Sequence, residues 1–270
     1  MTTISAPSAS PTASRGPQVG SFLPPPGPVP LTRLVGLEVR KMVDTLAGRW
    51  LVIVTLALAL VLMVAFAIFG EAPEVTVGTS LGAAGGPLGI LLPVLGIMAA
   101  TAEWSQRAGL VTFALEPRRG RIVLARVVAG LVLGVAVVVV SVALAYLVTA
   151  ATGLLGRPSG YDMSAAQLAG FVVVMALSVL QGVAFGFLFL NTPVAIVAVL
   201  ALPSVIAVAT QFSERMAEVA PWVDLSRSGA PLLEGTLTWT TAGQLATSSL
   251  LWIGLPLAIG TWRVLRSEVK

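Results

Sequence analysis

The chain has 270 residues, of which 56% are hydrophobic and only 10% are charged, and its mean hydropathy is +0.95. A soluble domain usually has about a quarter of its residues charged, so this composition excludes an ordinary water-soluble globule. The absence of cysteine and histidine excludes disulfides, thiol chemistry and the commonest metal ligand and general base. The net charge of +4 is typical of cytoplasmic loops in a membrane protein, so we expect no nucleic-acid partner.

The first 48 residues divide into two segments. Residues 1–30 contain eight prolines and one charge, Arg15, so we expect a disordered cytoplasmic tail. In residues 31–48 the apolar and polar residues fall on opposite sides of a helix, which predicts an amphipathic helix at the cytoplasmic interface. Leu37 and Glu38 do not fit this pattern. The alternative is that this segment is the frayed start of the first membrane span. Its expected apolar side consists of Leu31, Leu34, Val35, Val39, Met42, Val43 and Leu46.

The remaining sequence, residues 49–266, predicts an all-α integral membrane domain with six transmembrane helices. Each apolar run is about as long as a helix that crosses a hydrocarbon core. The predicted spans are residues 50–69, 78–100, 122–150, 165–190, 193–210 and about 242–262. The second span contains Pro87 and Pro93, so we expect it to be kinked. Residues 211–241 form an extracellular segment that we expect to make short helices resting on the outer interface through Trp222 and Trp239.

The distribution of basic residues predicts that both termini are cytoplasmic. In this topology twelve Lys and Arg residues lie inside, three (Arg157, Arg215 and Arg227) lie outside, and Arg15 is in the tail. Such an excess on one side is the usual signature of the cytoplasmic face. Small-x-x-x-small pairs begin at Gly82, Gly85, Gly130 and Gly182, and we expect most of them to pack helices within one chain.

Residues 101–121 form the one substantial cytoplasmic loop between predicted spans, and this loop carries a motif. Glu103 is followed by Arg107, Gly109 and Leu110, then by an apolar stretch with Phe113, by Pro117 and by the basic residues Arg118, Arg119 and Arg121. Together with the N-terminal amphipathic helix and six spans, this pattern resembles the membrane permease of a two-component bacterial ATP-binding cassette exporter, related to drug, antibiotic and polysaccharide exporters. The chain departs from the family pattern by inserting Ala108 before Gly109 and by lacking a Thr after it.

The resemblance implies a mechanical role for the loop. It would be a coupling helix seated on a separate ATPase subunit, with Glu103 and Arg107 fixing its angle. The predicted ATPase-coupling residues are Glu103, Arg107, Gly109, Leu110, Phe113, Pro117, Arg118 and Arg119. The resemblance further implies two ATPase copies, a second and identical permease subunit, and a multi-pass location in the bacterial plasma membrane. The alternative to a coupling role is an ordinary basic loop that only fixes the membrane topology.

The chain is not expected to be an enzyme. A phosphate-binding loop needs a Lys in a Gly-rich context, and the two lysines are Lys41 and the terminal Lys270. No catalytic residue, metal site or cofactor is therefore assigned to the chain, and ATP and Mg would bind the partner ATPase.

In the resembled family the second and fifth spans line the translocation path. The predicted path residues are Pro87, Pro93, Gln181, Asn191 and Pro203, although a lone Gln is more often an interhelical hydrogen-bond partner. The mostly apolar lining suits an amphipathic or lipid-like cargo such as a drug, antibiotic or lipid. The alternative function is a non-transport membrane scaffold or signalling protein that docks a soluble partner on the same loop.

Overall fold

The computed structural model describes residues 29–70, 74–106, 119–209, 212 and 214–266. Nearly all of them are helical, in the order α1 (Leu31–Asp44), α2 (Leu46–Phe69), α3 (Val77–Gln106), α5 (Arg119–Leu154), α6 (Ala165–Phe189), α7 (Thr192–Ala209), α8 (Glu214–Val223), α9 (Leu225–Glu234), α10 (Trp239–Ser249), the π-helical turn η1 (Leu250–Gly254) and α11 (Leu255–Arg266). The two strands, β1 (Val75–Thr76) and β2 (Ser159–Gly160), form one short parallel pair.

Within the described residues, five helical segments are long and apolar enough to cross a membrane, which makes the chain a multi-pass, all-α membrane protein. They are α2, residues 77–102 of α3, residues 120–154 of α5, α6 and the continuous helix from Trp239 to Arg266. The helix α7 is apolar but shorter. Each of these elements begins and ends within a few residues of a predicted span.

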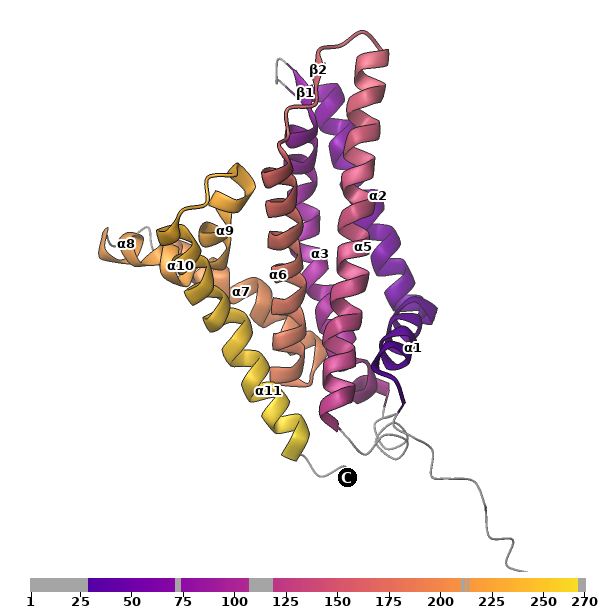
Figure 1. Cartoon of the computed structure of the whole chain (residues 1–270), viewed down its shortest axis with the longest axis vertical. Coiled ribbons are helices and arrows are strands. Elements are labelled where there is room, and N and C mark those ends of the chain that lie inside the picture. Colours follow the sequence, from indigo (N-terminus) through magenta and orange to yellow (C-terminus); the bar gives the residue numbers. More distant parts are fainter. Residues whose placement is uncertain (1–28, 71–73, 107–118, 210–211, 213, 267–270) are drawn as a thin grey trace, which may run out of the picture.

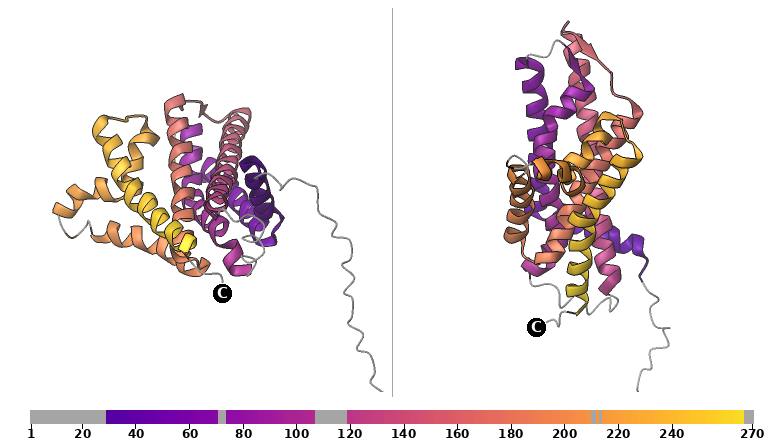
Figure 2. Two further views of the ribbon diagram at one scale, coloured as in Figure 1. Left: turned by 60° about the horizontal axis from the view of Figure 1, so that its bottom comes forward. Right: turned by 90° about the vertical axis from the view of Figure 1, so that its left-hand side faces the viewer.

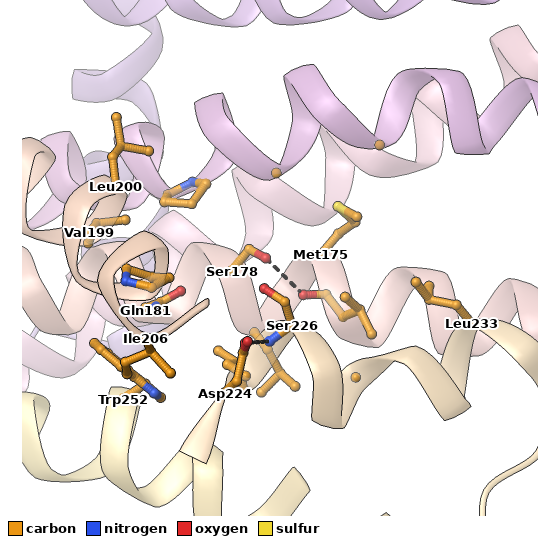
Figure 3. A pocket seen from close by; sticks show the side chains of 18 residues that line it. Met175, Ser178, Gln181, Val199, Leu200, Ile206, Asp224, Ser226, Leu233 and Trp252 are labelled. Atoms are coloured by element: carbon orange, nitrogen blue, oxygen red, sulfur yellow. Dashed lines mark hydrogen bonds between the residues drawn. The ribbon is translucent and has the colours of Figure 1, made fainter. Parts of the chain in front are cut away.

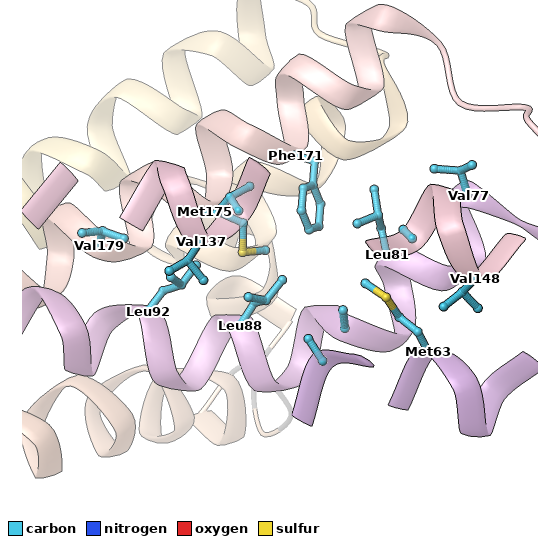
Figure 4. Packing of buried hydrophobic residues seen from close by; sticks show 14 of the residues in the cluster. Met63, Val77, Leu81, Leu88, Leu92, Val137, Val148, Phe171, Met175 and Val179 are labelled. Atoms are coloured by element: carbon cyan, nitrogen blue, oxygen red, sulfur yellow. The ribbon is translucent and has the colours of Figure 1, made fainter. Parts of the chain in front are cut away.

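The helices α3 and α6 form the centre of the bundle. In Figures 1 and 2, helices α1, α2 and α5 lie on one side of this pair, and α7 to α11 lie on the other. Beside α2 and α5, the core is built from buried aliphatic and sulfur-containing side chains, with Phe171, as Figure 4 shows. Some of its members are Met63, Leu88, Leu92, Val137 and Met175. The start of α1 and the end of α11 lie at the same end of the molecule, opposite β1 and β2 (Figure 1).

Glycines bring α3 and α6 into backbone contact. A Cβ atom added to Gly182 would lie 1.9 Å from the Pro93 carbonyl oxygen, and one added to Gly96 would lie 2.2 Å from that of Val179. Gly130 and Gly134 of α5 likewise face Val183 and Val179 of α6. The pairs that begin at Gly130 and Gly182 therefore pack helices within the chain, as expected. The pairs that begin at Gly82 and Gly85 do not, because a Cβ atom added at Gly82, Gly85, Gly86 or Gly89 would meet nothing within 4 Å.

The N-terminal helix α1 ends at Asp44, before the predicted boundary at residue 48. Thr45 starts a new helix because its hydroxyl accepts the Gly48 amide proton at 3.2 Å, and Gly48 lies against the Met42 carbonyl where a side chain would clash. The Thr45 cap and the close approach of Gly48 to the Met42 carbonyl together make the chain turn between α1 and α2. The sequence pattern of the amphipathic helix continued smoothly through this turn and gave no sign of it.

The apolar face of α1 packs on α5, and it includes the carboxylate that broke the sequence pattern. The side chain of Glu38 is only 14% exposed, and its Oε2 lies 3.7 Å from Nε of Arg126, a guanidinium that is 2% exposed. Its other oxygen accepts a hydrogen bond from Lys41 at 2.8 Å. Leu37, the other misplaced residue, is exposed. An ion pair with a buried partner on α5 therefore explains the position of Glu38.

Candidate functional site

A cavity with a volume of about 340 Å³ lies among α3, α6, α7, α9 and the π-helical turn η1. Most of its wall is apolar, and its polar groups come from Ser178 and Gln181 on α6 and from Asp224 and Ser226 at the start of α9. Figure 3 shows these four side chains gathered around the same space. Ligand sites in proteins typically have this character, with an apolar wall and a few convergent polar groups.

The helix α9 reaches this cavity by running antiparallel to the first half of α6. Gly170 of α6 lies against Leu232, where an added Cβ atom would be 2.0 Å from the carbonyl oxygen, and Gly229 of α9 faces Val174. The hydroxyls of Ser228 on α9 and Ser248 on α10 are 2.6 Å apart and buried. Two glycines and a buried hydrogen bond thus hold α9 inside the bundle. Its first residues lie beside Ser178, roughly 20 Å along α6 from the start of that helix.

The expected place of residues 211–241 at the outer membrane interface stays a prediction, while the structure shows how this segment packs on the bundle. The segment does form short helices, and Trp239 is exposed at its far end. However, α9 extends along α6 to the middle of that helix, and α8 lies beside α10 at the same height (Figure 1). The contact of α9 with α6 depends on Gly170, about sixty residues away in the sequence, which no pattern within residues 211–241 indicates.

Asp224 is the ionisable residue among those that line the cavity, and it is 7% exposed. Its Oδ1 accepts hydrogen bonds from the backbone amides of Ser226 at 2.8 Å and Arg227 at 3.4 Å, so it caps α9. Its Oδ2 lies 3.8 Å from Nε of Arg227, whose side chain is 46% exposed. One carboxylate oxygen therefore caps the helix, and the other forms an ion pair with Arg227.

Trp252 is placed at the cavity by the π-helical turn. Its indole Nε1 donates to the Val223 carbonyl at 2.5 Å, next to Asp224, and its ring stacks on Phe185 with centroids 6.0 Å apart. A single π turn inside an α-helix shifts the side chains that follow it around the helix axis, and such turns are frequent at functional sites. The turn therefore gives the cavity an aromatic wall and fixes the junction between α8 and α9.

Gln181 is only 8% exposed and lines the cavity. Within the described part of the chain its amide makes no hydrogen bond, whereas Ser178 beside it donates to the Val174 carbonyl at 3.1 Å. The interhelical hydrogen bond that was the alternative role for Gln181 is thus not formed by the described residues. Its amide retains both donor and acceptor capacity on the cavity wall.

The structure brings together three of the five predicted path residues. Pro93, Gln181 and Pro203 line the cavity. Pro87 is buried in α3 outside the lining, and Asn191 is exposed and accepts the Val194 amide proton at 3.2 Å as a cap for α7. Asp224, Ser226 and Trp252 were not predicted as path residues. The only sequence signal for Asp224 was that an aspartate before a helix can cap it, and its segment was predicted to be extracellular. No sequence feature predicts the π turn at Trp252.

The predicted ATPase-coupling residues cannot be placed in the same way. Arg107, Gly109, Leu110, Phe113, Pro117 and Arg118 lie outside the described residues, and only the backbone is described for Glu103 and Arg119. Glu103 is in the last turns of α3 and Arg119 begins α5. These two helix ends are at the same end of the molecule as α1 (Figure 1). The coupling role of the loop remains a prediction.

Comparison with known proteins gives no further assignment. No protein-family model matches the chain, and no curated protein matches it.

Proposed function

We propose that the chain is the permease subunit of an ATP-binding cassette exporter in a bacterial plasma membrane. The observation that carries the proposal is the cavity, because a mostly apolar space with a few polar groups inside a multi-pass bundle is what a cargo path requires. The scaffold alternative needs only a docking loop and has no use for such a space. The mostly apolar wall favours an amphipathic or lipid-like cargo.

The proposed topology has six spans with both termini in the cytoplasm, and α7 is the fifth of them. Its 18 residues give a length of about 27 Å, close to a typical hydrocarbon core. The basic residues at the end of the bundle that carries α1 support a cytoplasmic location for that end. They are Arg33, Arg40, Lys41, Arg121, Arg126, Arg263 and Arg266.

In this topology α8 and α9 are re-entrant helices that enter the membrane from outside without crossing it. Non-helical backbone at membrane depth is tolerated where it is buried in protein or lines a cavity. The junction at Asp224 meets both conditions, since its Oδ1 satisfies two amides of α9 and Trp252 satisfies the Val223 carbonyl. The buried carboxylate then marks a functional site, as intramembrane ionisable residues generally do.

The coupling step is proposed to pass through the loop between α3 and α5. A separate ATPase, binding ATP and Mg, would press on residues 103–119, and α3 would transmit the movement to Pro93 in the cavity wall. Two permease subunits and two ATPases would complete the transporter.

Replacing Glu103 with alanine tests this coupling. We expect ATP hydrolysis to continue while ATP-driven efflux of an amphipathic dye from reconstituted vesicles falls by about tenfold. This factor is within the range that typical coupling free energies between two sites produce. The matched control is Glu234→Ala, an exposed carboxylate at the far end of α9. Efflux by Glu103→Ala equal to that of the control would remove Glu103 from the mechanism.

A further inference from the structure

We propose that the cavity binds an amphipathic organic cation, with its ammonium group on Asp224 and its apolar body against the walls from α6, α7 and η1. The inference rests on the proposed function only in regarding this ligand as the cargo. The binding site itself is argued from the geometry of the chain.

The first argument is the amide of Gln181. The residue is 8% exposed and lines the cavity, and its amide has no hydrogen-bond partner within the described part of the chain. The amide can therefore complete its hydrogen bonds with a ligand or water in the cavity. Ser178, one turn away, offers free acceptor capacity on the same wall because its proton is directed to Val174.

The second argument is charge. Among the described residues that line the cavity, Asp224 is the ionisable one, so its carboxylate is the charged group that a ligand in the cavity can reach. A carboxylate offers about four lone-pair sites, and the cap of α9 uses those of Oδ1. Oδ2 forms an ion pair with Arg227, which is outside the lining, but their 3.8 Å separation is longer than a hydrogen bond and leaves the lone pairs of Oδ2 unused by it. Oδ2 can therefore accept a charge-assisted hydrogen bond from an ammonium group.

The third argument is the shape of the remaining wall. Trp252 supplies an aromatic surface beside Asp224, an arrangement that favours organic cations. Aliphatic side chains complete the wall, among them Met175, Val199, Leu200 and Ile206. The volume of about 340 Å³ is at the small end of the range for ligand sites. A bicyclic aromatic amine is of suitable size.

The test is a binding measurement on the full chain in lipid nanodiscs with three matched fluorescent probes. Naphthylethylamine is a cation, naphthylethanol is its neutral counterpart and naphthylacetate is an anion. Equilibrium dialysis against empty nanodiscs of the same lipid composition subtracts partition into lipid. We expect the amine to bind at least about tenfold more tightly than the alcohol, and the anion to bind least.

Two variants assign this preference to residues. Asp224→Asn keeps the helix cap, since Asn caps as well as Asp, and should lower the amine affinity to that of the alcohol while leaving the alcohol unchanged. Gln181→Leu should weaken both probes several-fold. The matched control is Glu234→Gln, which removes the same charge from an exposed position on α9 outside the lining.

Equal binding of the three probes to the unmodified chain would overturn the proposal, and that comparison needs no variant to fold. A preference for the amine that persists in Asp224→Asn would also overturn it. Since the measurement uses the chain alone, it is independent of any ATPase. If the chain binds the amine selectively but no ATPase co-purifies with it, the ligand site stands and the exporter function is rejected. If an ATPase co-purifies but the three probes bind equally, only the proposed class of ligand is rejected.

Discussion

Replacing Gly182 with alanine is expected to cause the largest loss of stability among single-methyl additions to the core. The new Cβ atom would lie 1.9 Å from the carbonyl oxygen, 2.6 Å from the carbonyl carbon and 2.8 Å from the Cα atom of Pro93. All three are backbone atoms inside α3, so no side-chain rotation relieves the clash. The helices α3 and α6 would have to separate, at a cost on the order of 3 kcal/mol.

Thermal unfolding in mild detergent measures this effect, and Gly86→Ala is the matched control. An added Cβ atom at Gly86 meets nothing within 4 Å, and alanine is the better helix former, so we expect the control to be neutral or slightly stabilising. Similar melting temperatures for the two variants would show that α3 and α6 are farther apart than described here.

Replacing Glu38 with alanine is the second large expected effect. The substitution removes the contact of the nearly buried carboxylate with Arg126 on α5 and its hydrogen bond with Lys41. A hydrogen-bonded charged group of this kind stabilises by roughly 1.5–3 kcal/mol, so the free energy of unfolding should fall by that amount. We also expect protease cleavage within α1 to become faster, because the ion pair holds this helix on α5.

Asp44→Ala is the control for Glu38, because Asp44 forms a pair with Arg40 in which the two side chains are 63% and 80% exposed. Exposed pairs on a helix contribute at most about 0.5 kcal/mol, so this variant should be almost unchanged. Equal destabilisation by the two substitutions would contradict the assigned position of Glu38.

The helices of the bundle were predictable because their signal is hydropathy over about twenty residues. The predicted span 193–210 corresponds to α7, Thr192–Ala209, and the predicted span near 242–262 lies within the helix Trp239–Arg266. Lipid requires long continuous helices, so composition alone decides where they are. The periodicity of α1 predicted most of the residues that share its apolar side, but that side was expected to lie among lipid, whereas the structure packs it on α5 and leaves Val43 and Leu46 exposed.

The cavity was less predictable because it depends on contacts between distant residues. Proline and glutamine inside predicted spans identified Pro93, Gln181 and Pro203, which the structure places on one wall. Asp224 reaches the cavity because α9 packs against Gly170, and Trp252 reaches it from the π turn. Neither the packing of α9 nor the π turn has a local sequence pattern. The aspartate was assigned to the exterior because a polar segment with two tryptophans is typical of a membrane surface.

The central claim, that this chain is the permease subunit of an ATP-driven transporter, is tested most directly by capture of its ATPase partner. The tagged chain is purified from its own cells in mild detergent, and the co-purifying proteins are assayed for ATP hydrolysis and identified by mass spectrometry. Scrambling residues 103–119 is the test variant, and scrambling 155–158, at the end of the bundle that carries β2, is the control. We expect a stoichiometric ATPase that is lost only in the test variant. Recovery of the intact chain without any ATPase would contradict the account and favour a membrane scaffold.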